Sequence, residues 1–258
     1  MSLIFIGDVH QNWADVEAGL SSLPAPPKAA VLLGDIECAQ PLDVVAAPLL
    51  DRGVRVHWIH GNHDYDTGAE MWANLANPDR NPRTAAGALH GRVVDIGGIR
   101  VAGLGGTFLP LVWPGQAPHR IHRRDQLPAY LAATHRHLDA AGMAALIHFL
   151  SVTAVWPEDV ELLSSQRADV LVTHEAPSSH PSGVGVLDDL ARAMGADLVV
   201  HGHHHITSHA KSDDGLSVLG VGDTWAVDLD GNVVWRGRKR DRPLPRPGDG
   251  WVFKSIAS

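Results

Sequence analysis

The sequence predicts an α/β fold in which two mixed β-sheets pack face to face. Short apolar runs of β type alternate with helical patterns over the first third of the chain, and a second alternation begins near residue 169. The order strand, helix, strand implies right-handed crossovers and parallel strands. The last apolar runs flank Asp230-Gly231, a turn signal typical of an antiparallel hairpin. Parallel and antiparallel pairs together make both sheets mixed.

The first half of the chain supplies the strands of one sheet and the start of the other. Strands are expected at residues 3–6, 29–33, 54–59, 93–96 and 99–104, and helices at residues 13–23 and 42–50. Gly97-Gly98 separates the last two strands and predicts a hairpin with a two-residue turn. From about residue 105 to residue 140 the pattern dissolves into Pro, Trp, His and Arg, which predicts an insertion over the active-site face.

The second half of the chain completes the fold. Helices are expected at residues 140–155, 157–166 and 184–194, and strands at residues 169–173, 197–201, 216–221, 225–229 and 233–235. We expect one domain over residues 1–237. Residues 238–258 are basic and rich in Pro, and they are predicted to form a surface tail.

Composition excludes several classes of protein. The chain has 258 residues, of which 45% are hydrophobic and 19% charged, so it is able to bury a sizeable core. A single cysteine, Cys38, excludes an intramolecular disulfide framework and cysteine-based metal sites, and it suits a reducing compartment. Any metal ion must therefore be held by nitrogen and oxygen ligands.

Charge and hydropathy favour a cytoplasmic protein and disfavour one that binds nucleic acid. Residues 236–246 carry six basic residues and one acidic residue, which leaves 15 basic and 28 acidic residues elsewhere. A uniformly basic nucleic-acid surface is therefore not expected. Residues 3–6 resemble a first strand more than a signal peptide, and the uncharged residues 140–156 are too few for a membrane span.

Polar residues with metal-binding chemistry follow the expected strands, where each strand ends. They are Asp8 and His10, Asp35, Asn62 and His63, His174, and His203 and His205. Ligands of parallel α/β sheets collect beyond the carboxyl ends of the strands, so these segments are expected to converge on one site.

The spacing of these residues suits a pair of metal ions. Side chains alternate along an extended segment, so Asp8 and His10 point the same way, as do His203 and His205. Four His, two Asp and one Asn, with one carboxylate bridging, make two adjacent sites with open positions. Two cations about 3.5 to 4 Å apart are able to share a hydroxide and to clamp the oxygens of a displacement at phosphorus. That chemistry is phosphoester hydrolysis.

The motifs resemble those of the calcineurin-like metallophosphoesterases. They are Gly7-Asp8-Val9-His10, Gly34-Asp35, Gly61-Asn62-His63-Asp64, His174 and Gly202-His203-His204-His205. The resemblance implies a four-layer α/β/β/α sandwich. It also implies that one metal is held by Asp8, His10, Asp35 and His205, and the other by Asp35, Asn62, His174 and His203. His63 would stabilise and protonate the leaving oxygen, with Asp64 as its orienting group.

One departure from the family pattern narrows the class of substrate. The protein Ser/Thr phosphatase branch carries Asp-Arg-Gly a few residues after its second-motif Asp, whereas here Asp51-Arg52-Gly53 lies 16 residues past Asp35. Phosphate contacts are therefore expected from Arg120, Arg123 and Arg124 of the insertion, because guanidinium groups bind phosphate in a bidentate way. A solvated basic surface is the alternative for these arginines.

Two further histidines lie next to the motifs. His60 directly precedes Gly61, and His201 shares the strand parity of His203 and His205. Each either supports the metal ligands or is simply a buried histidine.

The sequence thus predicts a phosphoesterase that depends on two divalent metal ions and acts on a small phosphodiester or a nucleotide. Mn²⁺ is the expected ion, with Fe, Zn or Ni as alternatives, because the ligands are imidazole and carboxylate. A phosphomonoesterase or protein-phosphatase-like activity, a nuclease, and a non-catalytic metal-binding scaffold remain as rival functions. The sequence predicts no oligomeric state.

Overall fold

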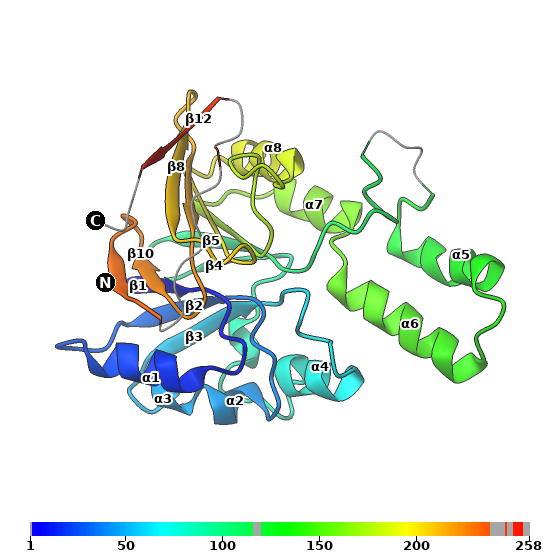
Figure 1. Cartoon of the computed structure of the whole chain (residues 1–258), viewed down its shortest axis with the longest axis horizontal. Helices are drawn as coiled ribbons and strands as arrows, with labels where there is room; N and C mark the ends of the chain where they lie inside the picture. The colour runs from blue at the N-terminus through cyan, green and yellow to red at the C-terminus, as the bar shows by residue number, and fades with distance from the viewer. Residues whose placement is uncertain (1, 116–119, 238–245, 247–249, 255–258) are drawn as a thin grey trace.

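The computed structural model describes residues 2–115, 120–237, 246 and 250–254. They form two mixed β-sheets that are covered on their outer faces by helices (Figure 1). The predicted four-layer α/β/β/α architecture is confirmed.

The first sheet has the strand order β11-β10-β1-β2-β3. Its strands are β1 (Leu3–Ile6), β2 (Ala29–Leu33), β3 (Arg55–Ile59), β10 (Ala226–Asp228) and β11 (Val233–Trp235). β1, β2 and β3 are parallel, whereas β10 runs antiparallel to both β1 and β11. The carboxyl ends of the three parallel strands therefore meet at one edge.

The second sheet has the strand order β12-β8-β9-β7-β6-β5-β4. Its strands are β4 (Arg92–Asp95), β5 (Arg100–Leu104), β6 (Val170–Thr173), β7 (Leu198–His201), β8 (Ser208–Ser212), β9 (Ser217–Gly220) and β12 (Trp251–Lys254). The run β5-β6-β7-β9 is parallel, and β4 pairs with β5 as the predicted hairpin.

Alternating side chains build the layers. In β1, Leu3 and Phe5 enter the core between the two sheets, whereas Ile4 and Ile6 face the outer core. The outer helices of the first sheet are α1 (Trp13–Ser21), α2 (Leu42–Val45), α3 (Ala47–Leu50) and α4 (Ala69–Ala76). The second sheet is covered by α7 (Pro157–Ser164) and α8 (Gly185–Met194).

A helical hairpin projects from the sandwich (Figure 1). It consists of α5 (Leu127–Thr134) and α6 (Ala140–Thr153), and the short helices η1 (Ala85–Gly87) and η2 (Arg124–Gln126) lie in the loops. A small core of its own, which contains Leu127, Leu131 and Trp156, joins the hairpin to the body. The predicted insertion at 105–140 therefore contains a helix that the sequence pattern did not indicate, and α6 continues the same projection.

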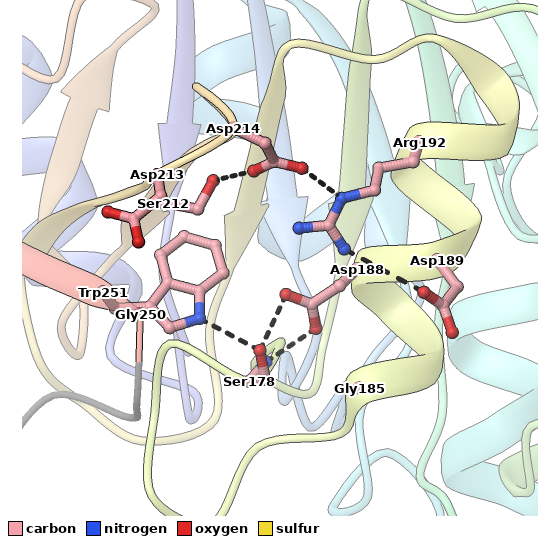
Figure 2. Close-up of a pocket in the computed structure, with 10 residues that line it drawn as sticks. All are labelled: Ser178, Gly185, Asp188, Asp189, Arg192, Ser212, Asp213, Asp214, Gly250 and Trp251. Atoms are coloured by element: carbon pink, nitrogen blue, oxygen red, sulfur yellow. Dashed lines mark hydrogen bonds and ion pairs between the residues drawn. The ribbon is translucent and has the colours of Figure 1, made fainter.

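The tail differs from the prediction in one respect. Residues 251–254 form β12, which pairs antiparallel with β8, so the second sheet extends beyond residue 237. Trp251 explains the pairing, because its ring is buried and its indole N–H donates to the Ser178 hydroxyl at 3.0 Å (Figure 2). The other tail residues, except Arg246 and Gly250, lie outside the described residues.

Other differences from prediction are local. The helix expected at 42–50 is broken at Ala46, where α3 begins anew with Pro48 in its first turn. Strand β8 and helix α4 were not predicted. Within the described part of the chain, no helix is long and apolar enough to cross a membrane.

Candidate metal centre

The first group of candidate ligands is Asp8, His10 and His205. Asp8 and His10 follow β1, and His205 follows β7. One donor atom from each residue lies within 4.8 Å of the others. The Nε2 atoms of His10 and His205 are 3.1 Å apart, a separation that suits two ligands of a single ion.

The second group contains Asp35, His174 and His203, whose donor atoms also lie within 4.8 Å of one another. Asn62 joins it, because its side-chain oxygen is 3.0 Å from His174 Nε2. The Nδ1–H of His174 donates to the Leu33 carbonyl at 2.8 Å, which turns Nε2 toward the other donors. The structure thus brings together all seven residues that the sequence nominated.

Asp35 lies between the two groups. Its Oδ2 is 3.9 Å from His10 Nε2 on one side and 3.4 Å from His174 Nε2 on the other. Its Oδ1 accepts the backbone N–H of His63 at 2.8 Å, which holds the carboxylate in place. This is the position that a bridging carboxylate requires.

The backbone is strained where these ligands lie. Asp8, His10, Asp35, His203 and His205 all have positive φ values, between 23° and 65°. Non-glycine residues rarely adopt this region, and such strain gathers at functional sites. The site is also crowded at Gly61, where a Cβ would lie 2.2 Å from Asp35 Oδ1, so a larger residue does not fit there.

Burial and charge in this centre fit divalent cations. Asp8 is fully buried, and its Oδ2 has no hydrogen-bond partner among the described residues. Burial raises the pKa of Asp8 to about 7. Burial also acts to raise the pKa of Asp35, but the neighbouring His174 lowers it below its usual range. A cation would compensate the buried carboxylates, and imidazole, carboxylate and amide donors suit Mn, Fe, Zn or Ni.

Comparison with known proteins decides the family. The family model described as calcineurin-like phosphoesterase matches residues 1–207. The chain belongs to this family. It is therefore a phosphoester hydrolase, and its polar centre is the candidate metal site of that enzyme. A Haemophilus influenzae protein named only as uncharacterized is 33% identical over 234 residues, which cover 90% of this chain and 96% of that protein.

Solved structures share the fold. A dimetal phosphatase from Danio rerio matches with a TM-score of 0.55 and 13% identity, over 89% of this chain and 92% of that one. The TT1561 protein of Thermus thermophilus matches with a TM-score of 0.53 and 14% identity, over 90% and 96% of the two chains. At these identities the likeness shows the architecture alone.

Glu37 is a residue of the phosphoesterase centre that the sequence did not nominate. The Nδ1–H of His10 donates to Glu37 Oε1 at 2.5 Å, so the opposite nitrogen, Nε2, faces His205 and Asp35. Gln11 Nε2 donates to the second Glu37 oxygen at 3.1 Å. Glu37 therefore orients His10 from behind, as carboxylates often do for metal-binding histidines.

The orienting partner of His63 is Asp66, whereas the sequence suggested Asp64. His63 Nδ1 lies 2.6 Å from Asp66 Oδ2. The fully buried Asp64 accepts three backbone N–H groups, from Ile36, Glu37 and Gly61, at 2.7 to 2.8 Å. Asp64 is thus occupied in joining the loops after β2 and β3.

Charge around His63 favours its protonated form. Burial acts to lower the pKa of His63, but the hydrogen bond to Asp66 and the nearby Asp35 raise it above its ordinary value. The side chain is 45% exposed, so substrate has access to it.

The three arginines of the insertion come just before α5, the first helix of the projecting hairpin. Arg120 and Arg123 are exposed, and Arg120 donates to the Tyr130 hydroxyl at 3.3 Å. Arg124 donates to both carboxylate oxygens of Asp159, at 2.8 and 3.0 Å. The hairpin reaches the loop of the metal centre through Tyr65, whose hydroxyl is 2.7 Å from His148 Nδ1. A phosphate contact by these arginines stays a prediction.

The two histidines next to the motifs are both buried. His201 donates from Nδ1 to the Gly202 carbonyl at 2.9 Å, and burial lowers its pKa to about 4. His60 packs edge-to-face on Trp72, with ring centroids 5.1 Å apart. His204 stacks on His180, with ring centroids 3.6 Å apart, and one of its ring nitrogens lies within 4.8 Å of donor atoms of His203 and Glu175.

Proposed function

We propose that this phosphoesterase hydrolyses a small phosphodiester or a nucleotide with two divalent metal ions, of which Mn²⁺ is the expected one. The observation that carries the proposal is the position of Asp35 between two groups of donors. Asp8, His10, Asp35 and His205 would hold one ion. Asp35, Asn62, His174 and His203 would hold the other.

The chain's own residues have separate tasks in this proposal. The bound cations would neutralise phosphate charge and make water a better nucleophile. Glu37 and the Leu33 carbonyl keep the metal-facing nitrogens of His10 and His174 in place. His63 holds a proton on a ring that Asp66 fixes, and it delivers that proton to the leaving oxygen.

The preference for a small substrate follows from the charge near the centre. Arg124 is paired with Asp159, and Arg120 and Arg123 lie on the projecting segment. We propose that Arg120 and Arg123 contact a second charged group of the substrate, whereas Arg124 stays paired with Asp159. Together with the net charge of −8, this favours a nucleotide or small diester over a nucleic acid.

The experiment begins with protein stripped by a chelator. Mn²⁺, Fe²⁺, Zn²⁺ or Ni²⁺ is added back, and hydrolysis of aryl monoesters, aryl diesters, nucleotides and single-stranded DNA is measured. We expect metal-dependent hydrolysis, fastest on diesters or nucleotides. His10→Ala is expected to lose activity, whereas variant His137→Ala, at an exposed histidine between α5 and α6, retains it. Hydrolysis that survives the chelator, or a preference for DNA, contradicts the proposal.

A further inference from the structure

A cavity of about 370 Å³ lies outside the metal centre, where β3, α4, α6 and α7 meet. Its walls include the indole rings of Trp58 and Trp72 and the imidazole rings of His60 and His90. The candidate metal ligands do not line it. The proposed hydrolysis therefore leaves this cavity without a role.

Polar atoms around the cavity lack partners. His60 is 2% exposed, and its Nε2 has no hydrogen-bond partner in the described part of the chain. The buried Nε of Arg124 likewise has none there. Buried polar groups without partners are costly, and they are rare unless something else binds them.

The cavity is electrically balanced. Asp159 pairs with the guanidinium of Arg124 through two hydrogen bonds, and both residues line the cavity. An anion or a cation would disturb this pair. A neutral molecule with donors and acceptors on its edge would not.

The walls are flat and aromatic. His60 meets Trp72 edge-to-face at 5.1 Å, and the rings of His60 and His90 are 4.8 Å apart. Such surfaces stack well against a planar ring. The ligand that fits is therefore planar as well as neutral.

A second cavity, of about 440 Å³ around Trp251, offers a contrast (Figure 2). There the polar groups bind one another: Asp188 accepts from the backbone and hydroxyl of Ser178, and Asp214 accepts from Arg192. That hollow presents no comparable unused buried atom among the described residues. Of these two cavities, only the one beside His60 has lining residues with buried nitrogens that lack a partner among the described residues.

The His60 cavity borders the loop of the metal centre. His60 precedes Asn62 by two residues, so their Cα atoms are at most about 7.6 Å apart. Trp72 also approaches Tyr65, with ring centroids 6.5 Å apart, and Tyr65 directly follows Asp64. A ligand in the cavity would thus lie next to the residues that act on phosphate.

We propose that this cavity binds a neutral, planar heteroaromatic ring with hydrogen-bonding groups on its edge, the chemistry of a nucleobase. The ring comes either from the substrate itself or from a separate nucleoside. Trp58 and Trp72 supply indole surface for the ring, and a small shift of the His60 and Arg124 side chains would bring the buried His60 Nε2 and Arg124 Nε to its edge.

Direct binding tests the cavity without any turnover. Metal-stripped protein is titrated with adenosine and with cytidine by isothermal calorimetry, so the outcome does not depend on the proposed hydrolysis. Ser151→Phe fills the cavity from α6, whereas Ala145→Phe places the same ring on an exposed part of that helix. We expect binding to weaken at least tenfold in Ser151→Phe and to stay within twofold of wild type in Ala145→Phe.

Trp72→Leu provides a second variant if Ser151→Phe fails to fold. It keeps an apolar side chain on α4 but removes the stacking face, so binding is again expected to fall at least tenfold. Absence of binding to the wild-type protein, or equal binding by the wild-type protein and the folded cavity variants, would overturn the proposal.

Inhibition kinetics then distinguish the two sources of the ring. Adenosine is added to metal-loaded protein during hydrolysis of a nucleotide. Competitive inhibition that is weakened by Ser151→Phe assigns the cavity to the substrate's own base. Noncompetitive inhibition, weakened by the same variant, assigns it to a separate nucleoside. Inhibition that the variant leaves unchanged places adenosine elsewhere and counts against the cavity.

Discussion

The metal centre and the projecting hairpin are built in opposite ways. The centre draws its ligands from five segments at the ends of β1, β2, β3, β6 and β7, and two of the ligands, Asp8 and Asp35, are buried at positive φ. Helix α6 has no Asp, Glu, Lys or Arg, yet only Thr153 among its 14 residues is fully buried. The sandwich therefore supports a rigid site, whereas the hairpin depends on a small core around Trp156.

This difference has an energetic basis. A residue held at positive φ costs on the order of 1 to 3 kcal/mol, and the surrounding structure must offset it. The two packed sheets do so for the metal ligands. The hairpin holds none of the metal ligands at positive φ, so substitutions there are expected to alter substrate affinity more than metal binding.

The largest effect is expected at the bridge. Asp35→Asn removes the charge shared by both cations, so metal occupancy should fall at both positions and turnover should drop by roughly 10³-fold. Metal analysis and hydrolysis of an aryl diester check this, and far-UV circular dichroism verifies that the fold survives. Full metal content with near-wild-type turnover would remove Asp35 as a bridge.

His63 is expected to act on the leaving group without holding metal. His63→Ala should therefore leave the metal content unchanged and lower kcat by roughly 10²-fold on a nucleotide. The loss should be smaller for p-nitrophenolate, which needs little protonation on departure. Asp66→Asn retains the imidazole but weakens its hydrogen bond, so its loss of kcat should be smaller than that of His63→Ala. Equal losses on both substrates would reduce His63 to a positioning residue.

A buried imidazole of the sandwich provides a pH test away from the metals. Burial, together with Arg55 and Arg92, lowers the pKa of His57 to about 4. The unfolded chain, with a pKa near 6.5, binds the proton more readily, so stability should decline as pH falls from about 6.5 to about 4. His57→Leu should remove about 3 kcal/mol of this decline, because each pKa unit corresponds to about 1.4 kcal/mol. Chemical denaturation in the presence of a chelator measures it, and an unchanged pH dependence would contradict the assignment.

Glu37 is expected to matter through His10. Glu37→Gln weakens the hydrogen bond that holds the ring, so Mn²⁺ affinity should fall about tenfold while the second site is less affected. Stepwise calorimetric titration of Mn²⁺ resolves the two sites. Loss of affinity at both sites in equal measure would indicate a general disturbance of the loop.

The smallest effect is expected from Arg120 and Arg123, the exposed arginines of the insertion. Because an exposed ion pair contributes under about 1 kcal/mol, the double substitution of Arg120 and Arg123 by Gln should raise KM for a nucleotide by no more than about fivefold. KM for an aryl ester and the metal content should not change. Unchanged KM on both substrates would leave these side chains as a solvated surface.

The sequence predicted the centre better than its surroundings. The strands that precede Asp8, Asp35 and Asn62 are short and strongly apolar, so the sequence pattern showed where each strand ends. Strand β8 escaped prediction because its buried residues are small or polar, as in Ser208 and Ala210. No apolar alternation marks such a strand.

The sequence pattern also did not predict which carboxylates form hydrogen bonds with His10 and His63. Glu37 and His10 meet across two loops and both adopt positive φ, and Asp66 reaches His63 across a single turn. Asp64 seemed the natural partner of His63, but burial commits it to three backbone N–H groups. Tertiary geometry, and not spacing, decides which carboxylate meets which imidazole.

The central claim is that Asp35 joins two cations in one centre. Electron paramagnetic resonance of metal-stripped protein during stepwise addition of Mn²⁺ tests it most directly. We predict that two ions bind per chain and yield the signal of an exchange-coupled pair, and that Asp35→Asn abolishes this coupling. A single bound ion, or two ions with the spectrum of isolated Mn²⁺, would contradict it.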